Sequence, residues 1–496
     1  MKRSSGILMH ISSLPGKYGI GTLGKEAFEF IDFLNEAGQT YWQVLPLGHT
    51  SYGDSPYQCF SAFAGNPYFI DFDNLREEGF LKIEDYENID FGEDRVKINY
   101  SKLFKNKMKI LKKAYENSKE INKKEIEIFR EKNKFWIEDY AFFMALKEKF
   151  SLASWQNWDE KIRLRDSKTL DEYKEILNEE INYWIFLQYN FFKQWNKLKN
   201  YANKLGIKII GDIPIYVAED SVDVWSNPKI FLLDNNKRPI KVSGCPPDAF
   251  SKTGQLWGNP IYDWAYLEKT DYYWWVERVR QSLSIYDVLR IDHFRGFESY
   301  WEIPYGDKTA INGKWVKGPG IKLFNAIKEK LGEVNIIAED LGYLTKEVID
   351  FRNKTGFPGM KVLQFAFDSQ GDSYYLPHNY INNSIAYTGT HDNDTVRGWF
   401  EVTGNKEDIK YAINYLRLTE EEGYNWGMIR GAWSSVSNIS IALMQDFLNL
   451  GNEARMNFPS KSEENWMWRA KKEDLTNELA KKIYEITKIY RRLKKW

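Results

Sequence analysis

The sequence contains few cysteines and no long apolar run. The chain has 496 residues and two cysteines, Cys59 and Cys245, which is too few for a disulfide framework and fits a reducing compartment. No apolar stretch reaches the roughly 18 residues of a membrane-spanning helix. The apolar run at 6–10, behind Lys2 and Arg3, is too short for a signal peptide. The sequence therefore predicts a soluble cytoplasmic protein with no membrane partner.

Neither acidic nor basic residues are in excess. Asp and Glu number 70, Lys and Arg number 69, and the net charge is −1. A groove for nucleic acid requires an excess of basic residues, so no nucleic-acid partner is expected. Aromatic residues are abundant instead, at 16% of the chain with 19 Trp. Aromatic rings fill protein cores, and they also stack on the faces of sugar rings; composition alone leaves both explanations open.

Short β-branched runs that end in polar residues recur along the chain and predict strands. They cover residues 41–47, 207–212, 287–292, 335–339, 361–367 and 384–387. Amphipathic stretches separate most of them, and strands that alternate with helices indicate a parallel sheet. This many units in one chain favours the α/β class, as a (β/α)8 TIM barrel with largely helical insertions.

The pattern of strands is interrupted between residues 76 and 200. Phe104, Met108, Leu111 and Tyr115 recur at helical spacing there, which predicts a mostly helical insertion. Its many lysines are interleaved with glutamates, as is typical of a solvent-exposed helix face rather than a polyanion site. We interpret residues 1–496 as a single catalytic barrel that contains this insertion.

Carboxylates follow several of the predicted strands. They are Asp212, Asp292, Glu339 with Asp340, and Asp392 with Asp394. A single aspartate after a strand can simply cap a helix or start a turn. Carboxylates on four separate strands are better explained by an active site, because barrel enzymes gather their functional residues at the carboxyl ends of the strands.

Two chemistries could use such a ring of carboxylates. The first is binding of a divalent metal, and the second is glycoside chemistry by a nucleophile and a proton donor. Arg290 lies two residues before Asp292, so both side chains point to the same face of the strand. A guanidinium there would pair with Asp292 and keep it ionised, whereas it would be repelled by a dication. The sequence favours glycoside chemistry without a metal or another cofactor.

Longer sequence strings resemble a known family. Arg290-Ile-Asp292, Glu339 and His391-Asp392 are similar to the catalytic regions of α-amylase-type enzymes. The strings at 12–16, 42–47, 55–58, 61–67, 211–217, 246–248, 254–260, 290–296, 338–342, 389–395 and 452–457 resemble the 4-α-glucanotransferases of glycoside hydrolase family 77, the amylomaltases or disproportionating enzymes. The resemblance runs from about residue 6 to residue 469.

This resemblance implies a retaining enzyme that transfers a segment of an α-1,4-glucan to the 4-OH of another glucan or of glucose. Asp292 would be the nucleophile, Glu339 the general acid/base and Asp392 the transition-state stabiliser. The residues expected to bind substrate are Tyr57, Asp212, Phe250, Trp257, Arg290, His293 and His391. Phe250 and Trp257 are expected in one loop, 246–260, that closes over the site.

The sequence is also compatible with three alternative functions. An amylolytic α-1,4-glucan hydrolase would use the same residues, and a metal-dependent barrel enzyme would use the same ring of carboxylates. A non-catalytic glucan-binding protein would need the aromatic residues but not Asp292 together with Glu339. Trp466 and Trp468 are expected to pack against the barrel rather than to bind glucan.

Overall fold

Eight parallel strands form a closed barrel, which confirms the predicted fold class. A computed structural model describes residues 2–119, 121–247, 251–342, 344–368, 371, 373–459, 461 and 463–494. The barrel strands, in chain order, are β1 (Ser4–Leu8), β2 (Tyr41–Gln43), β3 (Lys208–Ile213), β6 (Val288–Ile291), β9 (Ile336–Ala338), β10 (Gly359–Val362), β11 (Ser384–Tyr387) and β12 (Ile439–Leu443). Their order around the barrel is β1-β12-β11-β10-β9-β6-β3-β2.

The first and last strands of the barrel, β1 and β12, were not among the predicted strands. β1 contains two serines and a glycine, which weaken any β-strand signal. Gly6 is needed where β1 meets β2, because a Cβ there would lie 2.6 Å from the Cβ and the carbonyl oxygen of Tyr41. The predicted strand 361–367 is wrong in its bounds: β10 ends at Val362, and Leu363–Phe365 form a 3-10 turn.

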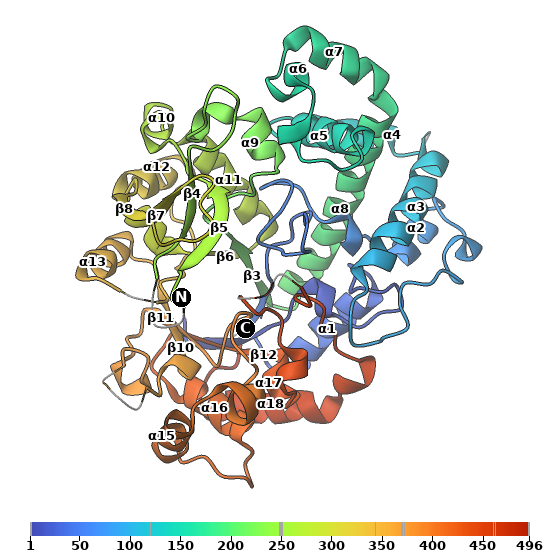
Figure 1. Ribbon diagram of the computed structural model, residues 1–496. Coiled ribbons are helices and arrows are strands. Elements are labelled where there is room, and N and C mark those ends of the chain that lie inside the picture. The colour runs from blue at the N-terminus through green and yellow to red at the C-terminus, as the bar shows by residue number, and fades with distance from the viewer. Residues whose placement is uncertain are drawn as a thin grey trace.

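Helices surround the barrel and fill its longest connection (Figure 1). Their bounds are α1 (Lys25–Glu36), α2 (Phe72–Glu77), α3 (Tyr100–Ser118), α4 (Lys123–Lys132), α5 (Ile137–Lys149), α6 (Glu160–Arg163), α7 (Ser167–Ile176), α8 (Asn178–Lys204), α9 (Val222–Ser226), α10 (Trp264–Lys269), α11 (Tyr273–Ile285), α12 (Ile321–Leu331), α13 (Lys346–Thr355), α14 (Val396–Gly398), α15 (Lys406–Leu416), α16 (Tyr424–Ser434), α17 (Met444–Phe447) and α18 (Asn477–Ile489). No described helix is both long enough and apolar enough to cross a membrane.

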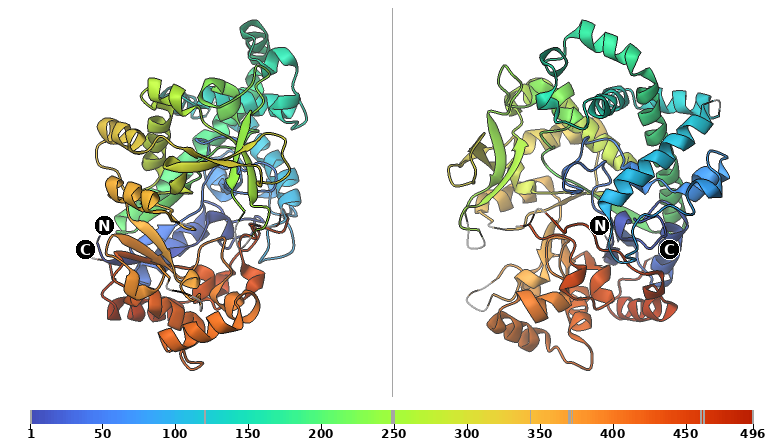
Figure 2. Two further views of the ribbon diagram at one scale, coloured as in Figure 1. Left: turned by 60° about the vertical axis from the view of Figure 1, so that its left-hand side comes forward. Right: turned by 45° about the vertical axis from the view of Figure 1, so that its right-hand side comes forward.

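The connection from β2 to β3 contains α2 to α8 and forms a helical region on one side of the barrel (Figure 2). Its longest helix, α8, has 27 residues. Trp184 of α8 packs against Tyr140 of α5, with ring centroids 6.1 Å apart. Farther along α8, the indole of Trp195 donates a hydrogen bond to the carbonyl of Ile285, which ends α11. One helix thus joins the helical region to the helical layer of the barrel.

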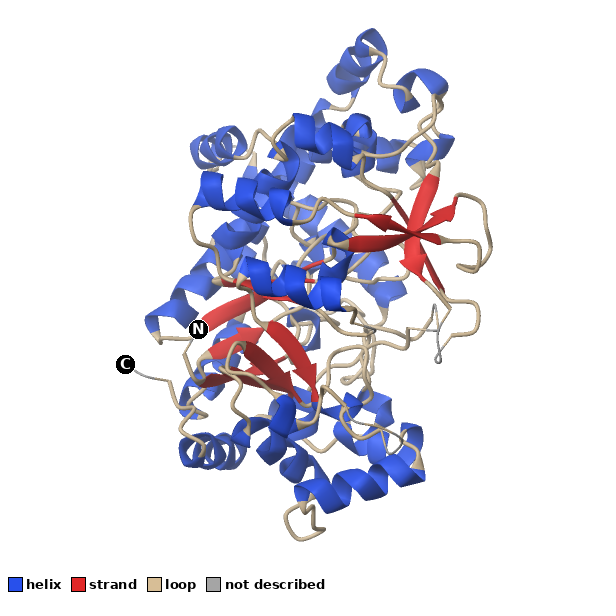
Figure 3. Cartoon of the chain, turned by 90° about the vertical axis from the view of Figure 1, so that its left-hand side faces the viewer, coloured by secondary structure: helices blue, strands red, loops and turns tan. Residues whose placement is uncertain are grey.

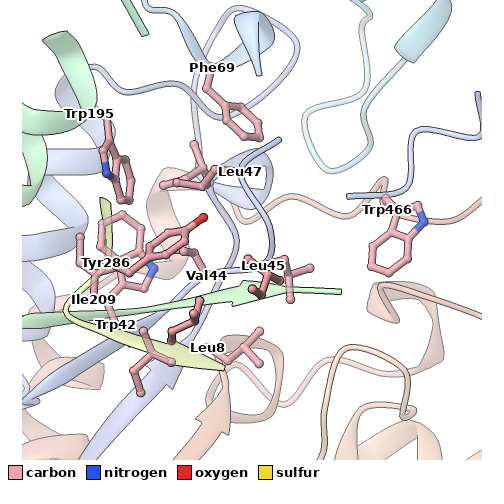
Figure 4. Packing of buried hydrophobic residues seen from close by; sticks show 14 of the residues in the cluster. Leu8, Trp42, Val44, Leu45, Leu47, Phe69, Trp195, Ile209, Tyr286 and Trp466 are labelled. Atoms are coloured by element: carbon pink, nitrogen blue, oxygen red, sulfur yellow. The ribbon is translucent and has the colours of Figure 1, made fainter. Parts of the chain in front are cut away.

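Much of the aromatic surplus is buried. The largest fully buried side chains include Trp42, Trp155, Trp195, Trp225, Trp275 and Trp433. Figure 4 shows part of this core, where Trp195 packs edge-on against Tyr286, with ring centroids 6.2 Å apart. Gly211 makes room for the Tyr286 ring, since a Cβ at that position would lie 2.1 Å from the ring. The core therefore accounts for a large part of the aromatic content.

A second, antiparallel sheet lies apart from the barrel strands (Figure 3). Its order is β5 (Gln255–Pro260), β4 (Lys241–Cys245), β7 (Ser299–Pro304) and β8 (Lys314–Lys317). The prediction of one loop over 246–260 is wrong for its second half, because β5 pairs with β4 and carries Trp257. The prolines at its ends and the two glycines inside it weaken the β-strand signal of this segment, because both residue types are rare in strands. Phe250 lies outside the described residues.

Candidate active site

Three of the predicted acidic residues, Asp212, Asp292 and Glu339, lie at the carboxyl ends of the neighbouring barrel strands β3, β6 and β9. In the register of β3 and β6, Asp212 lies opposite Arg290. Beyond the end of β9, which pairs with β6, the backbone N–H of Glu339 donates a hydrogen bond to the carbonyl of Ile291 at 3.0 Å. Asp292 directly follows Ile291, so the strand register places Asp292 and Glu339 side by side. Residues far apart in the sequence are brought together by strand pairing alone.

Arg290 is the buried centre of this cluster. Its guanidinium donates to Asp212 Oδ2 at 2.5 Å through Nη1 and to Asp292 Oδ1 at 3.0 Å through Nη2. The pairing of Arg290 with Asp292, predicted from their spacing, is therefore confirmed. Burial acts to lower the pKa of Arg290, but the two carboxylates outweigh burial and raise it well above its ordinary value. The guanidinium thus carries a fixed positive charge.

Asp292 and Glu339 interact electrostatically as a pair. Burial raises the pKa of both carboxyls, and at both positions Arg290 acts in the opposite direction. The charge of Glu339 also raises the pKa of Asp292. Because ionisation of one carboxyl raises the pKa of the other, the pair favours a state in which one carboxyl is ionised and the other keeps its proton. A nucleophile and a proton donor require such a pair.

The carboxylate of Glu339 is oriented by two backbone amides. Oε2 accepts a hydrogen bond from the N–H of His293 at 2.6 Å, and Oε1 accepts one from the N–H of Leu341 at 2.7 Å. His293 has a φ of +49°, a left-handed conformation that costs about 1 kcal/mol or more for a residue other than glycine. Strain of this kind is found where the backbone must direct a group at a site.

The side chain of His293 contacts Trp257, a sugar-binding candidate on strand β5 of the second sheet. Its ring packs edge-on against the indole of Trp257, with centroids 4.7 Å apart. Burial, and then the neighbouring charge of Arg295, lowers the pKa of His293 to about 3, so the imidazole is neutral near pH 7. Trp257 is partly buried and its Nε1 donates to Gln255 Oε1 at 3.1 Å. Strand β5 thus reaches the edge of the site.

Tyr57 and His391 form the opposite wall of the cluster. The Tyr57 hydroxyl donates to Asp212 Oδ2 at 2.8 Å, and its ring stacks on His391 with centroids 4.9 Å apart. Trp466 packs against both rings, at 5.8 and 5.7 Å. Trp466 and Trp468 are buried, with 5% and 6% of their surface exposed, which confirms that they pack. Burial lowers the pKa of His391, while Asp392 opposes this.

Asp392 is the most open acidic residue of the cluster, with 49% of its side chain exposed. Its Oδ1 accepts a hydrogen bond from Asn457 Nδ2 at 2.7 Å. Arg455 Nη2 donates to the Asp392 carbonyl at 2.6 Å, and the Asn457 N–H donates to the His391 carbonyl at 3.1 Å. Asn457 and Arg455 were missed as site residues. Their string, 452–457, stands out in the sequence, but only the fold brings it to Asp392.

We expect Asn457→Ala to lower kcat about tenfold while KM changes little. The substitution removes the hydrogen bond that fixes Asp392, and a bond to a charged group has an energy of that order. Glucose release from maltotriose gives kcat and KM, and thermal unfolding provides the stability. Asn383→Ala is the matched control, because its exposed amide binds only the Gly356 carbonyl. Equal kcat for wild type and Asn457→Ala would contradict this role.

In the part of the chain that the structure describes, no group of three or more His, Cys, Asp or Glu side chains is arranged to hold a metal ion. Around Arg290 the acidic side chains are instead occupied by hydrogen bonds to a guanidinium, a phenol and backbone amides. This arrangement suits proton transfer and nucleophilic attack.

Comparison with known proteins identifies the family. A family described as 4-alpha-glucanotransferase, glycoside hydrolase family 77, matches residues 9–476. A 4-alpha-glucanotransferase of Clostridium butyricum is 64% identical over 98% of this chain and 100% of its own length. One of Thermus thermophilus is 46% identical over 99% of this chain and 100% of its own length.

Solved structures agree with the sequence comparison. An amylomaltase from Streptococcus agalactiae, in complex with acarbose, superposes with a TM-score of 0.97 at 48% identity, and the match covers 99% of this chain and all of the other. An amylomaltase from Corynebacterium glutamicum, at 17% identity, shares the fold with a TM-score of 0.78, over 99% of this chain and 75% of the other. The chain therefore belongs to the 4-alpha-glucanotransferases of glycoside hydrolase family 77.

Proposed function

We propose that this 4-alpha-glucanotransferase cleaves an α-1,4-glucan and transfers the released segment to the 4-OH of another glucan or of glucose, through a glycosyl-Asp292 intermediate. The observation that carries the proposal is the pair of carboxyl groups at neighbouring strand ends: Asp292, bound by Arg290, and Glu339, bound by two backbone amides. A second support is the acarbose bound in the Streptococcus agalactiae relative.

In the first step, a carboxylate oxygen of Asp292 attacks the anomeric carbon of the donor glucan. Glu339 gives its proton to the glycosidic oxygen, and the bond from that oxygen to the anomeric carbon breaks. The fragment with the new 4-OH leaves, and the remaining glucosyl segment is held as an ester of Asp292. The 3.0 Å contact with Arg290 stabilises the ionised form of Asp292, which is the form that attacks.

In the second step, an acceptor replaces the departed fragment. Glu339, now ionised, takes the proton of the acceptor 4-OH while that oxygen attacks the anomeric carbon and displaces Asp292. Two inversions at one carbon retain its configuration. The backbone bonds from His293 and Leu341 support this role, because they hold Glu339 at one place through both proton transfers.

The remaining site residues would bind sugar or stabilise charge. Asp392, half exposed and fixed by Asn457, would stabilise the positive charge that develops on the sugar ring. The wall of Tyr57 and His391 and the side chains of Asp212 and Arg290 would bind the sugar next to the broken bond. Trp257 and His293 would bind the glucan beyond it, and Phe250 is proposed for the same role from the sequence alone.

Incubation with maltotriose separates transfer from hydrolysis. Each transfer exchanges one glycosidic bond for another and leaves the number of reducing ends unchanged, so we expect glucose plus a ladder of longer oligosaccharides at a nearly constant number of reducing ends. Transfer exceeds hydrolysis when the acceptor is held in place so that its attack is effectively intramolecular. Chromatography and a reducing-end assay measure both quantities. A steady rise in reducing ends, with products only shorter than maltotriose, would establish the hydrolase alternative instead.

We expect Trp257→Ala to weaken glucan use sharply while the melting temperature falls only modestly. Trp257 is partly buried and contacts His293 at the site, so its loss removes a stacking surface rather than core packing. The measurements are kcat/KM for maltotriose and thermal unfolding. Trp275→Ala is the contrasting control, because Trp275 is 0% exposed and its loss should destabilise by about 3–5 kcal/mol. A reversed result would make Trp257 a core residue.

We also propose that the whole chain acts as one catalytic unit in the cytoplasm. Helix α8 of the helical region, α2 to α8, also packs on the helical layer of the barrel, which supports a single unit. Cell fractionation with activity measured in each fraction tests the location, and activity concentrated outside the cytosolic fraction would contradict it.

A further inference from the structure

A cavity of about 370 Å³ lies away from the active site, where the loop after α6 meets the chain around α9 and α10. In Figure 1, α6, α9 and α10 all lie in the upper part of the molecule. None of the residues that line the cavity belongs to the candidate active site. Its volume is within the range of small-molecule sites, about 300–1,000 Å³.

The lining of this cavity is strongly basic. Arg163, Arg165, Lys229 and Lys237 line it, and no Asp or Glu is among the lining residues. Arg165 forms an ion pair with Asp139 at 3.1 Å. Within the described residues, the other three cations have no carboxylate within ion-pair distance. Three of the four cations that line the cavity therefore have no ion-pair partner among the described residues, although the chain as a whole has a net charge of −1.

The two arginines are held in place by the surrounding structure. The Arg165 guanidinium lies over the Trp225 ring, 4.3 Å from its centroid, and Trp225 is itself 1% exposed. The Nη1 atom of Arg165 is buried and has no hydrogen-bond partner in the described part of the chain. Arg163 Nη1 donates to the Asn236 carbonyl at 3.1 Å. These contacts fix the direction of two cationic groups and leave part of their donor capacity unused.

We propose that this cavity binds the phosphate monoester of a hexose, either as a free sugar phosphate or as a phosphate-bearing unit of a glucan. A phosphate dianion complements the unneutralised cations, and guanidinium groups bind phosphate by paired hydrogen bonds. The cavity is much larger than a phosphate group requires. Ser226, Asn227 and Tyr266 also line it, and they supply neutral polar groups for sugar hydroxyls and an aromatic ring for a sugar face.

Calorimetric titration of the full-length protein with glucose 6-phosphate tests the proposal. We expect saturable binding that weakens with added salt, because the contact is ionic. Glucose 6-phosphate should bind more tightly than inorganic phosphate, since the hexose also contacts the cavity. Equal or tighter binding of inorganic phosphate would overturn the hexose assignment. A maltooligosaccharide that carries a 6-phosphate is titrated in parallel. Tighter binding of glucose 6-phosphate would identify a free sugar phosphate as the ligand, and tighter binding of the oligosaccharide would identify a phosphate-bearing unit of a glucan.

The variant Lys229→Gln/Lys237→Gln locates the binding. Removal of two cations should weaken binding of glucose 6-phosphate about tenfold or more, as expected for the loss of two charges close to a dianion. Lys124→Gln/Lys132→Gln on α4 removes the same charge elsewhere and should leave binding unchanged. Disproportionation of maltotriose should be normal in both variants, which shows that they are folded. Unchanged affinity in the first variant, or an equal loss in both, would overturn the proposal.

Discussion

Asp292→Asn should reduce glucan transfer by about 10³-fold or more, as expected for a residue that acts as part of a catalytic unit. The amide has nearly the shape of the carboxylate and can remain beside Arg290, so the fold should persist. It cannot form the glycosyl ester, because an amide is a poor nucleophile. Transfer from maltotriose measures the loss, and mass spectrometry of the quenched protein should detect no glycosyl adduct.

Asp287→Asn is the matched control for Asp292→Asn. Asp287 precedes the same strand, β6, at the opposite end of the barrel, where it accepts hydrogen bonds from the N–H of Ile209 and from Asn203. Residues at the amino ends of barrel strands serve stability rather than catalysis. We expect near-normal transfer with some loss of stability. If Asp292→Asn kept a tenth of wild-type activity, its assignment as the nucleophile would be wrong.

Glu339→Gln should cause a loss of similar size with maltotriose, but for a different reason. The amide can neither protonate the glycosidic oxygen nor deprotonate the acceptor, whereas Asp292 remains intact. An α-glucosyl fluoride needs no proton donor for its leaving group. We therefore expect this variant to react with the fluoride and to accumulate a glycosyl ester on Asp292, detected by mass spectrometry.

Added azide should then release the sugar, because azide attacks without a general base. Asp340→Asn is a contrasting variant one residue away. Asp340 is buried and paired with Arg352 at 2.5 Å, so its loss should destabilise the protein by about 3–5 kcal/mol and leave the fluoride reaction largely unchanged. If Glu339→Gln transferred maltotriose normally, or failed with the fluoride as well, Glu339 would not be the acid/base.

The barrel and most of the cluster at its strand ends could be predicted from the sequence. β-branched runs such as 207–212 and 287–292 are local signals, because a buried parallel strand needs apolar residues on both faces. The spacing of Arg290 and Asp292 is equally local, since residues two apart share one face of a strand. These features could be predicted because they depend on neighbours in the chain.

The distant residues that complete the site could be identified only in the folded chain. The partners of Asp392, Tyr57 and Glu339 are Asn457, Asp212 and the N–H of His293. Strand β5 contains a proline and a glycine, which weaken its signal in the sequence. It forms because β4 pairs with it. The cationic cavity likewise joins residues 163–165 to residues 225–237. Contacts of this kind depend on the closure of the barrel and on the packing of its long connection, which fix distances that no local pattern encodes.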